Sequence, residues 1–124
     1  MLCSDIPLDQ QLRQRITRIV SISGLHDLRP LLKTQMNANL KLTAKKAIAE
    51  SQALQEPLTH AEVVCCCGAD ERPEFIRQNA LLANIWQGFG VSTQYVEIPN
   101  RRHFNILELL TRFSTFKKSI ESPA

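Results

Sequence analysis

The chain has 124 residues, of which 44% are hydrophobic and 22% are charged, and its formal net charge is +3 at pH 7. This amount of apolar material suffices for one modest core, so we expect a single globular domain over residues 1–124. No run of about 18 apolar residues, no signal-peptide pattern and no long basic stripe with interleaved aromatics occurs, so we expect a cytoplasmic protein that neither spans a membrane nor binds nucleic acid.

The N-terminal part of the sequence predicts a helix followed by a strand. Apolar residues at positions 8, 12 and 16 indicate a short amphipathic helix over residues 8–16, with Ile6 as its hydrophobic staple. The mostly β-branched run after it predicts a buried strand from about residue 18 to residue 23, which Gly24 ends.

Two helical segments and a loop are predicted before the next strand. Asp27 is expected to cap a helical turn over residues 30–33, and the Asn-rich stretch after that turn is expected to be a loop. Thr43 is a candidate N-cap for a helix over residues 43–54, which a proline three positions later separates from the next strand.

A second buried strand and the clearest helix of the chain follow. The apolar run over residues 61–67 predicts the strand, which Gly68 closes. The helix is predicted to begin near Pro73 and to end at Gly88, and its large apolar side chains recur at spacings of three, four and seven. We therefore expect this stripe, with Trp86, to lie in the core.

The last part of the chain predicts a third strand and a final helix. The strand is expected over residues 91–98 and the helix from residue 104 to about residue 113. The polar tail at residues 114–124 is expected to fray. The apolar stripe of the final helix comprises Ile106, Leu109, Leu110 and Phe113.

The four cysteines predict neither disulfides nor a metal site. Cys65, Cys66 and Cys67 are consecutive, and Cys3 is isolated. Because neighbouring side chains of a strand point to opposite faces, Cys66 cannot join the other two around one ion, and no zinc-type spacing occurs. Free cysteine is among the most buried residue types, so we expect these side chains in the core, and no cofactor.

Alternating strands and helices predict a parallel sheet with helices on its faces and right-handed crossovers. In such sheets the chemistry lies outside the carboxyl ends of the strands. The loops expected there carry His26 with Asp27, then Asp70 with Glu71, and then residues 101–103. An acid and a histidine on neighbouring strand ends are two of the three parts of a nucleophile, acid and histidine triad.

Three segments carry a resemblance to a known family. "VSISGLHDLRPLL", "GADERPEFIRQNALLANIW" and "HFNILELLTRF" resemble the C-terminal part of an α/β-hydrolase of the kynurenine formamidase (arylformamidase) and carboxylesterase-like group. The resemblance runs from about residue 1 to residue 113. It implies an α/β fold that corresponds to the C-terminal half of an α/β-hydrolase, with about three parallel strands and flanking helices.

The resemblance also implies two catalytic positions. The family's acid lies just before the Pro-Glu-Phe segment, which places it on Glu71, with Asp70 as the rival. The family's histidine directly precedes the Phe at the start of the last helix, which places it on His103. The family then implies a small-molecule substrate with an ester or formamide bond.

The chain departs from the family in what it lacks. Its glycines stand only at positions 24, 68, 88 and 90, so it contains neither a Gly-x-Ser-x-Gly nucleophile elbow nor a glycine-rich oxyanion segment. Where the family usually reads Ser-Pro after the middle helix, this chain reads Ser51-Gln52. We expect Met1 to be an internal methionine of a longer enzyme, and the chain to be inactive alone.

Each candidate residue also has a structural interpretation. His103 is otherwise a helix-cap or surface histidine, and Glu71 is otherwise a first-turn acid that the helix dipole favours. The remaining polar candidates have expected structural places: His26 and Asp27 in a turn and a cap, His60 towards solvent, and Arg77 and Gln78 bracing the acid loop or facing solvent.

Two functions therefore remain open. The first is the C-terminal portion of a serine hydrolase, which a complementing N-terminal half would make active. The second is a non-catalytic module that self-associates or binds a partner through the open edges of its sheet. An enzyme of another class that uses the cysteines or His26 is not supported by their spacing.

Overall fold

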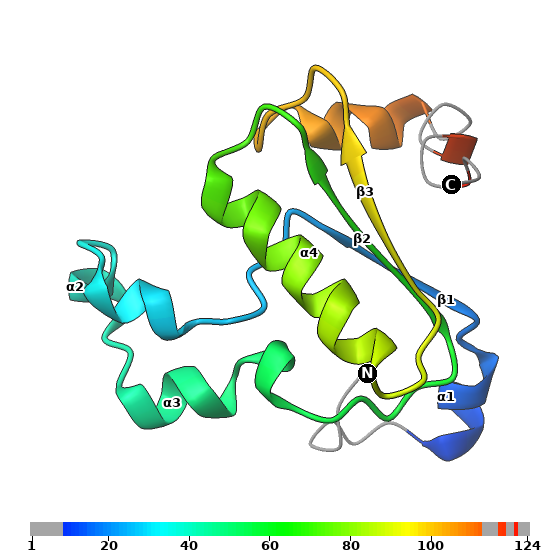
Figure 1. The fold of residues 1–124 in the computed structure, drawn as a ribbon, viewed down its shortest axis with the longest axis horizontal. Helices are drawn as coiled ribbons and strands as arrows, with labels where there is room; N and C mark the ends of the chain where they lie inside the picture. The colour runs from blue at the N-terminus through cyan, green and yellow to red at the C-terminus, as the bar shows by residue number, and fades with distance from the viewer. Residues whose placement is uncertain (1–8, 113–116, 119–120, 122–124) are drawn as a thin grey trace.

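The computed structural model describes residues 9–112, 117–118 and 121, and a three-stranded sheet lies at its centre (Figure 1). The strands are β1 (Arg18–Ile22), β2 (Glu62–Gly68) and β3 (Thr93–Ile98), in the spatial order β1-β2-β3. Both neighbouring pairs run parallel. The expected α/β architecture, with three parallel strands and flanking helices, is confirmed.

The central strand β2 is buried on both faces, as the continuous apolar run predicts. On one face, Val63 and Cys65 pack in a cluster with Trp86. On the other face, Val64 and Cys66 pack in a second cluster that includes residues of the last helical segment. This alternation follows from the two-residue period of a strand, and it gives the molecule a layer on each side of its sheet.

The three consecutive cysteines lie in this core as free thiols. Burial raises the pKa of Cys65 to about 11 and that of Cys66 to about 12. Burial also raises the pKa of Cys67. The expectation that these three side chains fill the core is confirmed, whereas Cys3 lies outside the described residues.

One long helix, α4 (Pro73–Gln87), covers the first face of the sheet (Figure 1). It begins with Pro73 in its first turn and ends at Gly88, as predicted. Trp86 is fully buried, and its Nε1–H donates to the carbonyl oxygen of Gln55 at 3.2 Å. The helix thereby fixes the loop that enters β2 as well as the sheet itself.

The connection from β1 to β2 contains four short helical segments rather than the predicted two. They are η1 (Arg29–Lys33), α2 (Asn37–Leu40), α3 (Ala44–Ala49) and η2 (Gln52–Leu54), and η1, α2 and α3 extend to one side of the sheet in Figure 1.

The expected Asn-rich loop is therefore wrong in part, because it contains α2. The side chain of Asn37 stabilises this short helix by accepting a hydrogen bond from the backbone N–H of Leu42 at 2.8 Å. Lys41 ends the helix in a left-handed conformation, with a φ of 51°.

The predicted helix over residues 43–54 is broken in two. Thr43 caps its start as expected, because its Oγ1 accepts from the N–H of Lys46 at 3.2 Å. The break occurs at Ser51, whose hydroxyl donates to the carbonyl oxygen of Ala47 and accepts from the N–H of Leu28 at 2.8 Å. These side-chain bonds compete with helical backbone bonds and turn the chain inwards.

The first helix is shorter than predicted. α1 (Gln10–Arg15) starts at its N-cap Asp9, whose carboxylate accepts from the N–H of Gln11 at 3.1 Å. None of the residues in α1 is buried, so this helix is stabilised by its cap more than by core packing. The staple expected from Ile6 lies outside the described residues.

The last helix is a 3₁₀ helix, η3 (Ile106–Arg112), and not the α-helix predicted from residue 104. The side chain of Asn105 accepts from the N–H of Arg102 at 2.6 Å, which holds the preceding residues in a turn and delays the helix. Ile106 and Leu109 are buried as predicted, Leu110 is exposed, and Phe113 lies outside the described residues.

Most of the tail at residues 114–124 lies outside the described residues, and its expected fraying stays a prediction. Residues 117, 118 and 121 are helical, and Glu121 lies 3.4 Å from the guanidinium of Arg18. No helix in the described part of the chain is long and apolar enough to cross a membrane.

Candidate active site

Three polar side chains meet at the carboxyl ends of the three strands. Ser23 directly follows β1, Glu71 lies in the turn after β2, and His103 lies in the turn after β3. Because parallel strands end at one common edge, the three turns are neighbours although the residues are far apart in sequence. This edge is where the sequence predicts the acid and the histidine.

Glu71 and His103 form a carboxylate–imidazole pair. The Nδ1 atom of His103 lies 2.9 Å from Oε1 of Glu71. The Glu71 side chain is fully buried, whereas the side chain of His103 is 40% exposed. A carboxylate at Nδ1 favours the tautomer that carries its proton there, so Nε2 on the other side of the ring becomes the basic nitrogen.

The second oxygen of the Glu71 carboxylate is held by two donors. The hydroxyl of Ser23 donates to Oε2 at 2.8 Å, and the backbone N–H of Gly68 donates to the same atom at 2.8 Å. Both oxygens of the buried carboxylate therefore have partners, which offsets the cost of removing it from water.

A glycine makes this arrangement possible. A Cβ atom on Gly68 would lie 2.1 Å from the carbonyl oxygen of Arg101, so no other residue fits there without a backbone shift. The same close approach allows the N–H of Asp70 to donate to that oxygen at 3.0 Å. The turn after β2 is thus fastened to the turn after β3, and this brings Glu71 to His103.

Asp70, the rival acid, is exposed, and its backbone rather than its carboxylate joins the two turns. Of the two neighbouring acids, the structure brings Glu71 to the histidine. The catalytic roles of Glu71 and His103 stay a prediction.

The pair lines a hollow of about 450 Å³. The ring of Phe75 lies 4.4 Å from the imidazole of His103 and is tilted by 30°, so it limits how the imidazole can rotate. Phe104 contacts the imidazole edge-on at 5.2 Å and is itself 91% exposed. The residues that line the hollow are Met36, Asp70, Glu71, Arg72, Phe75, Arg102, His103 and Phe104.

The loop after β1 is held by Gln78, which braces a different loop from the one predicted. The buried side-chain oxygen of Gln78 accepts from the N–H groups of His26 and Asp27, each at 2.7 Å. Its amide nitrogen donates to the carbonyl oxygen of Asp27 and to the carboxylate of Glu74. Gln78 therefore ties α4 to the β1 loop, whereas Arg77 pairs with Glu74 at the surface.

His26 and Asp27 have structural partners away from the Glu71–His103 pair, but Asp27 is not the predicted cap, because Leu28 occupies the N-cap position of η1 and no side-chain hydrogen bond caps that helix. His26 is buried with its Nε2 3.2 Å from the hydroxyl of Ser21, and burial lowers its pKa. Asp27 pairs with the guanidinium of Arg29 at 2.8 Å, which lowers the pKa of its carboxyl, and it also accepts from the N–H of Arg29 at the start of η1.

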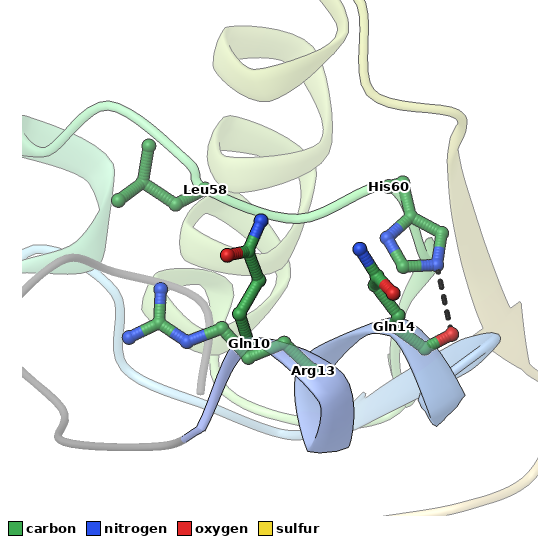
Figure 2. Close-up of a pocket in the computed structure, with 5 residues that line it drawn as sticks. All are labelled: Gln10, Arg13, Gln14, Leu58 and His60. Atoms are coloured by element: carbon green, nitrogen blue, oxygen red, sulfur yellow. Dashed lines mark hydrogen bonds between the residues drawn. The ribbon is translucent and has the colours of Figure 1, made fainter.

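A second hollow, of about 420 Å³, lies where α1 meets the segment that enters β2 (Figure 2). His60, which lies here, is exposed as expected, and its Nε2 is 3.2 Å from the carbonyl oxygen of Gln14. The five described residues that line this hollow include no carboxylate to pair with the imidazole: Gln10, Arg13, Gln14, Leu58 and His60. The hollow beside Glu71 and His103 therefore remains the candidate active site.

Sequence reasoning missed the contribution of Ser23 to the site. It treated this serine as the last residue of a strand, whereas β1 ends at Ile22 and Ser23 has a φ of 51°. A Ser-Gly pair directly after a buried strand was the available signal, since such residues often mark a sharp change of direction.

Comparison of the sequence with known proteins finds two curated relatives. The chain is 30% identical over 95 residues to the kynurenine formamidase of Salmo salar and 26% identical over 94 residues to that of Danio rerio. Each match covers 72% of this chain and 32% of the relative, so the chain spans about a third of the length of the curated relatives it matches. No family model matches the sequence.

A solved structure is similar over nearly the whole chain. It is a crystal structure of a protein from Silicibacter sp. TM1040 that is provisionally described as a thioesterase. The TM-score is 0.78 at 36% sequence identity, over 93% of this chain and 42% of that protein. The chain thus has an α/β-hydrolase-like fold with weak homology to kynurenine formamidase and structural similarity to a protein described as a thioesterase.

Proposed function

We propose that this chain supplies the base and the acid of a serine hydrolase that cleaves ester or formamide bonds. The observation that carries the proposal is the 2.9 Å contact between the buried carboxylate of Glu71 and Nδ1 of the half-exposed His103. A buried carboxylate behind an accessible imidazole, beside a hollow at the carboxyl end of a parallel sheet, is the arrangement that acyl transfer requires.

His103 would act as the proton shuttle. Its Nε2 takes the proton from a serine hydroxyl as the hydroxyl oxygen attacks the acyl carbon, and it then returns that proton to the leaving group. Glu71 acts through Nδ1, where it orients the ring and stabilises the imidazolium that forms. The ring of Phe75 keeps the imidazole in place while its charge changes.

The nucleophile is proposed to come from polypeptide outside these 124 residues. The sequence contains no Gly-x-Ser-x-Gly motif and no glycine-rich oxyanion segment, and both are needed to place a serine hydroxyl and to stabilise the oxyanion. The curated relatives are about three times as long as the matched region, which leaves room in such a protein for both elements.

The lining of the hollow around His103 is suited to binding a small organic substrate. Its walls include the side chains of Met36, Phe75 and Phe104, which would pack against an apolar acyl or aryl group. The names of the similar proteins indicate a formamide or a thioester, which is one kind of ester, and a serine activated by the same acid and base can attack the acyl carbon of either.

A chimera tests this proposal. In it, the aligned part of this chain replaces the matching segment of the kynurenine formamidase of Salmo salar, and the hydrolysis of an aryl ester and of an aryl formamide is measured. We expect an active enzyme, in which His103→Ala lowers kcat by about 10⁴ because the proton shuttle is lost.

The matched control is His60→Ala, which removes a histidine at the hollow beside α1. This variant is expected to retain the activity of the chimera. An active chimera in which His103→Ala and His60→Ala have equal rates would refute the proposed role of His103.

A second candidate function is a module that self-associates without catalysis. In the sheet that the structure describes, β1 and β3 each pair only with β2, so each outer strand has an open edge that another chain could extend. Gel filtration with light scattering tests this function: a dimer supports it, and a monomer at all accessible concentrations contradicts it.

A further inference from the structure

We propose that Ser23 is a positioning residue that locks the Glu71 carboxylate in the orientation that pairs with His103. This role rests on the proposed function of the pair. With this role, the site has one residue after each strand: Ser23 after β1, Glu71 after β2 and His103 after β3.

The contact geometry supports this role. The Ser23 hydroxyl and the Gly68 N–H both donate to Oε2 of Glu71, each at 2.8 Å. Because two donors hold one oxygen, rotation of the carboxylate would break both bonds. Oε1 is then the atom left to face the imidazole, and it lies 2.9 Å from Nδ1.

Burial makes the hydroxyl hard to replace. Ser23 is only 8% exposed and the Glu71 side chain is fully buried. A water molecule therefore cannot readily take the place of the hydroxyl if that group is removed, and Oε2 would keep only the Gly68 donor.

The backbone of Ser23 gives an independent argument. Its φ of 51° lies in the left-handed region, which glycine adopts freely and serine does not. Its N–H donates to the carbonyl oxygen of Cys66 at 2.7 Å, so the residue is fastened to the central strand. A side chain at a position where glycine would be less strained indicates that the hydroxyl itself is used.

The tautomer of His103 provides the test, since it depends on the carboxylate at Nδ1. The whole 124-residue chain, labelled with ¹⁵N-histidine, is studied by NMR at alkaline pH, where imidazoles are neutral. Wild type is expected to carry its proton on Nδ1. In Ser23→Ala, the equilibrium between the two tautomers shifts by about fivefold towards the Nε2–H form, the change that corresponds to one ordinary hydrogen bond.

Two further variants make the experiment decisive. Ser23→Gly also lacks the hydroxyl but relieves the strained backbone, so it is expected to fold and to show the same shift as Ser23→Ala. Ser21→Ala is the matched control, because Ser21 lies two residues before Ser23, within β1, and its hydroxyl contacts His26. It is expected to leave the His103 tautomer unchanged.

The outcomes separate this inference from the proposed function. If His103 keeps the Nδ1–H form in both Ser23→Ala and Ser23→Gly, then Ser23 does not position the carboxylate, although the pair itself stands. If wild-type His103 is not protonated on Nδ1, the Glu71–His103 pair fails, and the role of Ser23 fails with it. A shift in both Ser23 variants and none in Ser21→Ala supports the proposal.

Discussion

At the scale of single residues, burial distinguishes the two adjacent acids of the site. Glu71 is buried with donors on both carboxylate oxygens, whereas its neighbour Asp70 is exposed. A buried carboxylate that loses its charge leaves donors without a full partner, and an exposed one does not. The same chemical change should therefore have different effects at the two positions.

Glu71→Gln is expected to destabilise the protein by about 1–3 kcal/mol. The amide has one acceptor oxygen where the carboxylate has two, so if this oxygen accepts from the Gly68 N–H, the NH2 group faces His103 and the imidazole loses its present Nδ1–H partner. Asp70→Asn is the matched control and should change stability by less than about 0.5 kcal/mol. Urea unfolding measures both, and equal losses would contradict the burial argument.

The stability of the protein should also depend on His26 in weakly acidic solution. Burial lowers the pKa of His26 below its ordinary value of 6.5, so the unfolded chain binds a proton at a higher pH than the folded chain does. The stability that neutral His26 contributes is therefore complete above about pH 6.5 and falls as the pH drops from there to the folded pKa.

A comparison of wild type with His26→Gln isolates this effect from other titrating groups. The free energy of unfolding is measured in urea at about pH 7.5 and about pH 5.5. Wild type should lose more stability between these two conditions than the variant does. An equal loss in the two proteins would show that His26 does not titrate differently in the folded state.

At the scale of elements, the site depends on how closely the turn after β2 approaches the turn after β3. Gly68 permits that approach, because its missing side chain leaves room for the carbonyl oxygen of Arg101. The N–H of Ala69 then donates to the carbonyl oxygen of Ile98 at the end of β3, and the N–H of Asp70 donates to that of Arg101 in the turn after it. A larger residue at position 68 would push these two turns apart.

Gly68→Ala is accordingly expected to destabilise the protein by roughly 1–3 kcal/mol, as overpacking does, and to disturb the Glu71–His103 pair. Gly88→Ala is the control, since its backbone is already right-handed helical and its nearest neighbour is an oxygen at 3.2 Å. Its stability should change by no more than about 0.5 kcal/mol. Similar losses in the two variants, measured by urea unfolding, would contradict the steric argument.

Elements whose side chains follow one simple pattern could be predicted from the sequence. The buried run of β2 and the long stripe of α4 gave both elements within a residue or two of their ends. In two of the helices whose extent was mispredicted, a side chain bonds to the backbone. Ser51 breaks the helix that follows Thr43, and Asn105 delays the start of η3. Such bonds depend on the surroundings of one residue and leave no periodic signal.

The site was predictable in position but not in detail. The order of strands and helices places the acid turn and the histidine turn at one edge of the sheet. The choice of Glu71 over Asp70 followed from the family pattern, whereas its burial follows from the contact of Gly68 with Arg101, across a long sequence separation. The hydrogen bond from Ser23 to Glu71 depends on the left-handed backbone conformation of Ser23, which sequence patterns do not encode.

At the scale of the whole molecule, the proposed function gives this chain only part of what a serine hydrolase needs. The hollow beside His103 contains a carboxylate and an imidazole, and the sequence contains no nucleophile elbow. A serine hydrolase also needs an activated serine and an oxyanion hole. These two elements provide most of the rate enhancement in such enzymes. Catalysis is therefore expected to require further polypeptide.

The isolated chain should not hydrolyse a chromogenic acetyl ester above the rate in buffer. The chimera with the Salmo salar relative serves as the positive control in the same assay. Turnover by the isolated chain that His103→Ala abolishes would show that these 124 residues hold a complete active site after all.

The acid of the pair offers the most direct test of the central claim, which is that His103 transfers the proton while Glu71 orients its ring and stabilises the imidazolium. The measurement is kcat of the chimera with Glu71→Gln and with Asp70→Asn. The account predicts a fall of about 10⁴ for Glu71→Gln, because the imidazole loses the group that fixes its tautomer, and a rate close to that of the parent for Asp70→Asn. An unchanged rate in Glu71→Gln, or a large fall in Asp70→Asn alone, would contradict it.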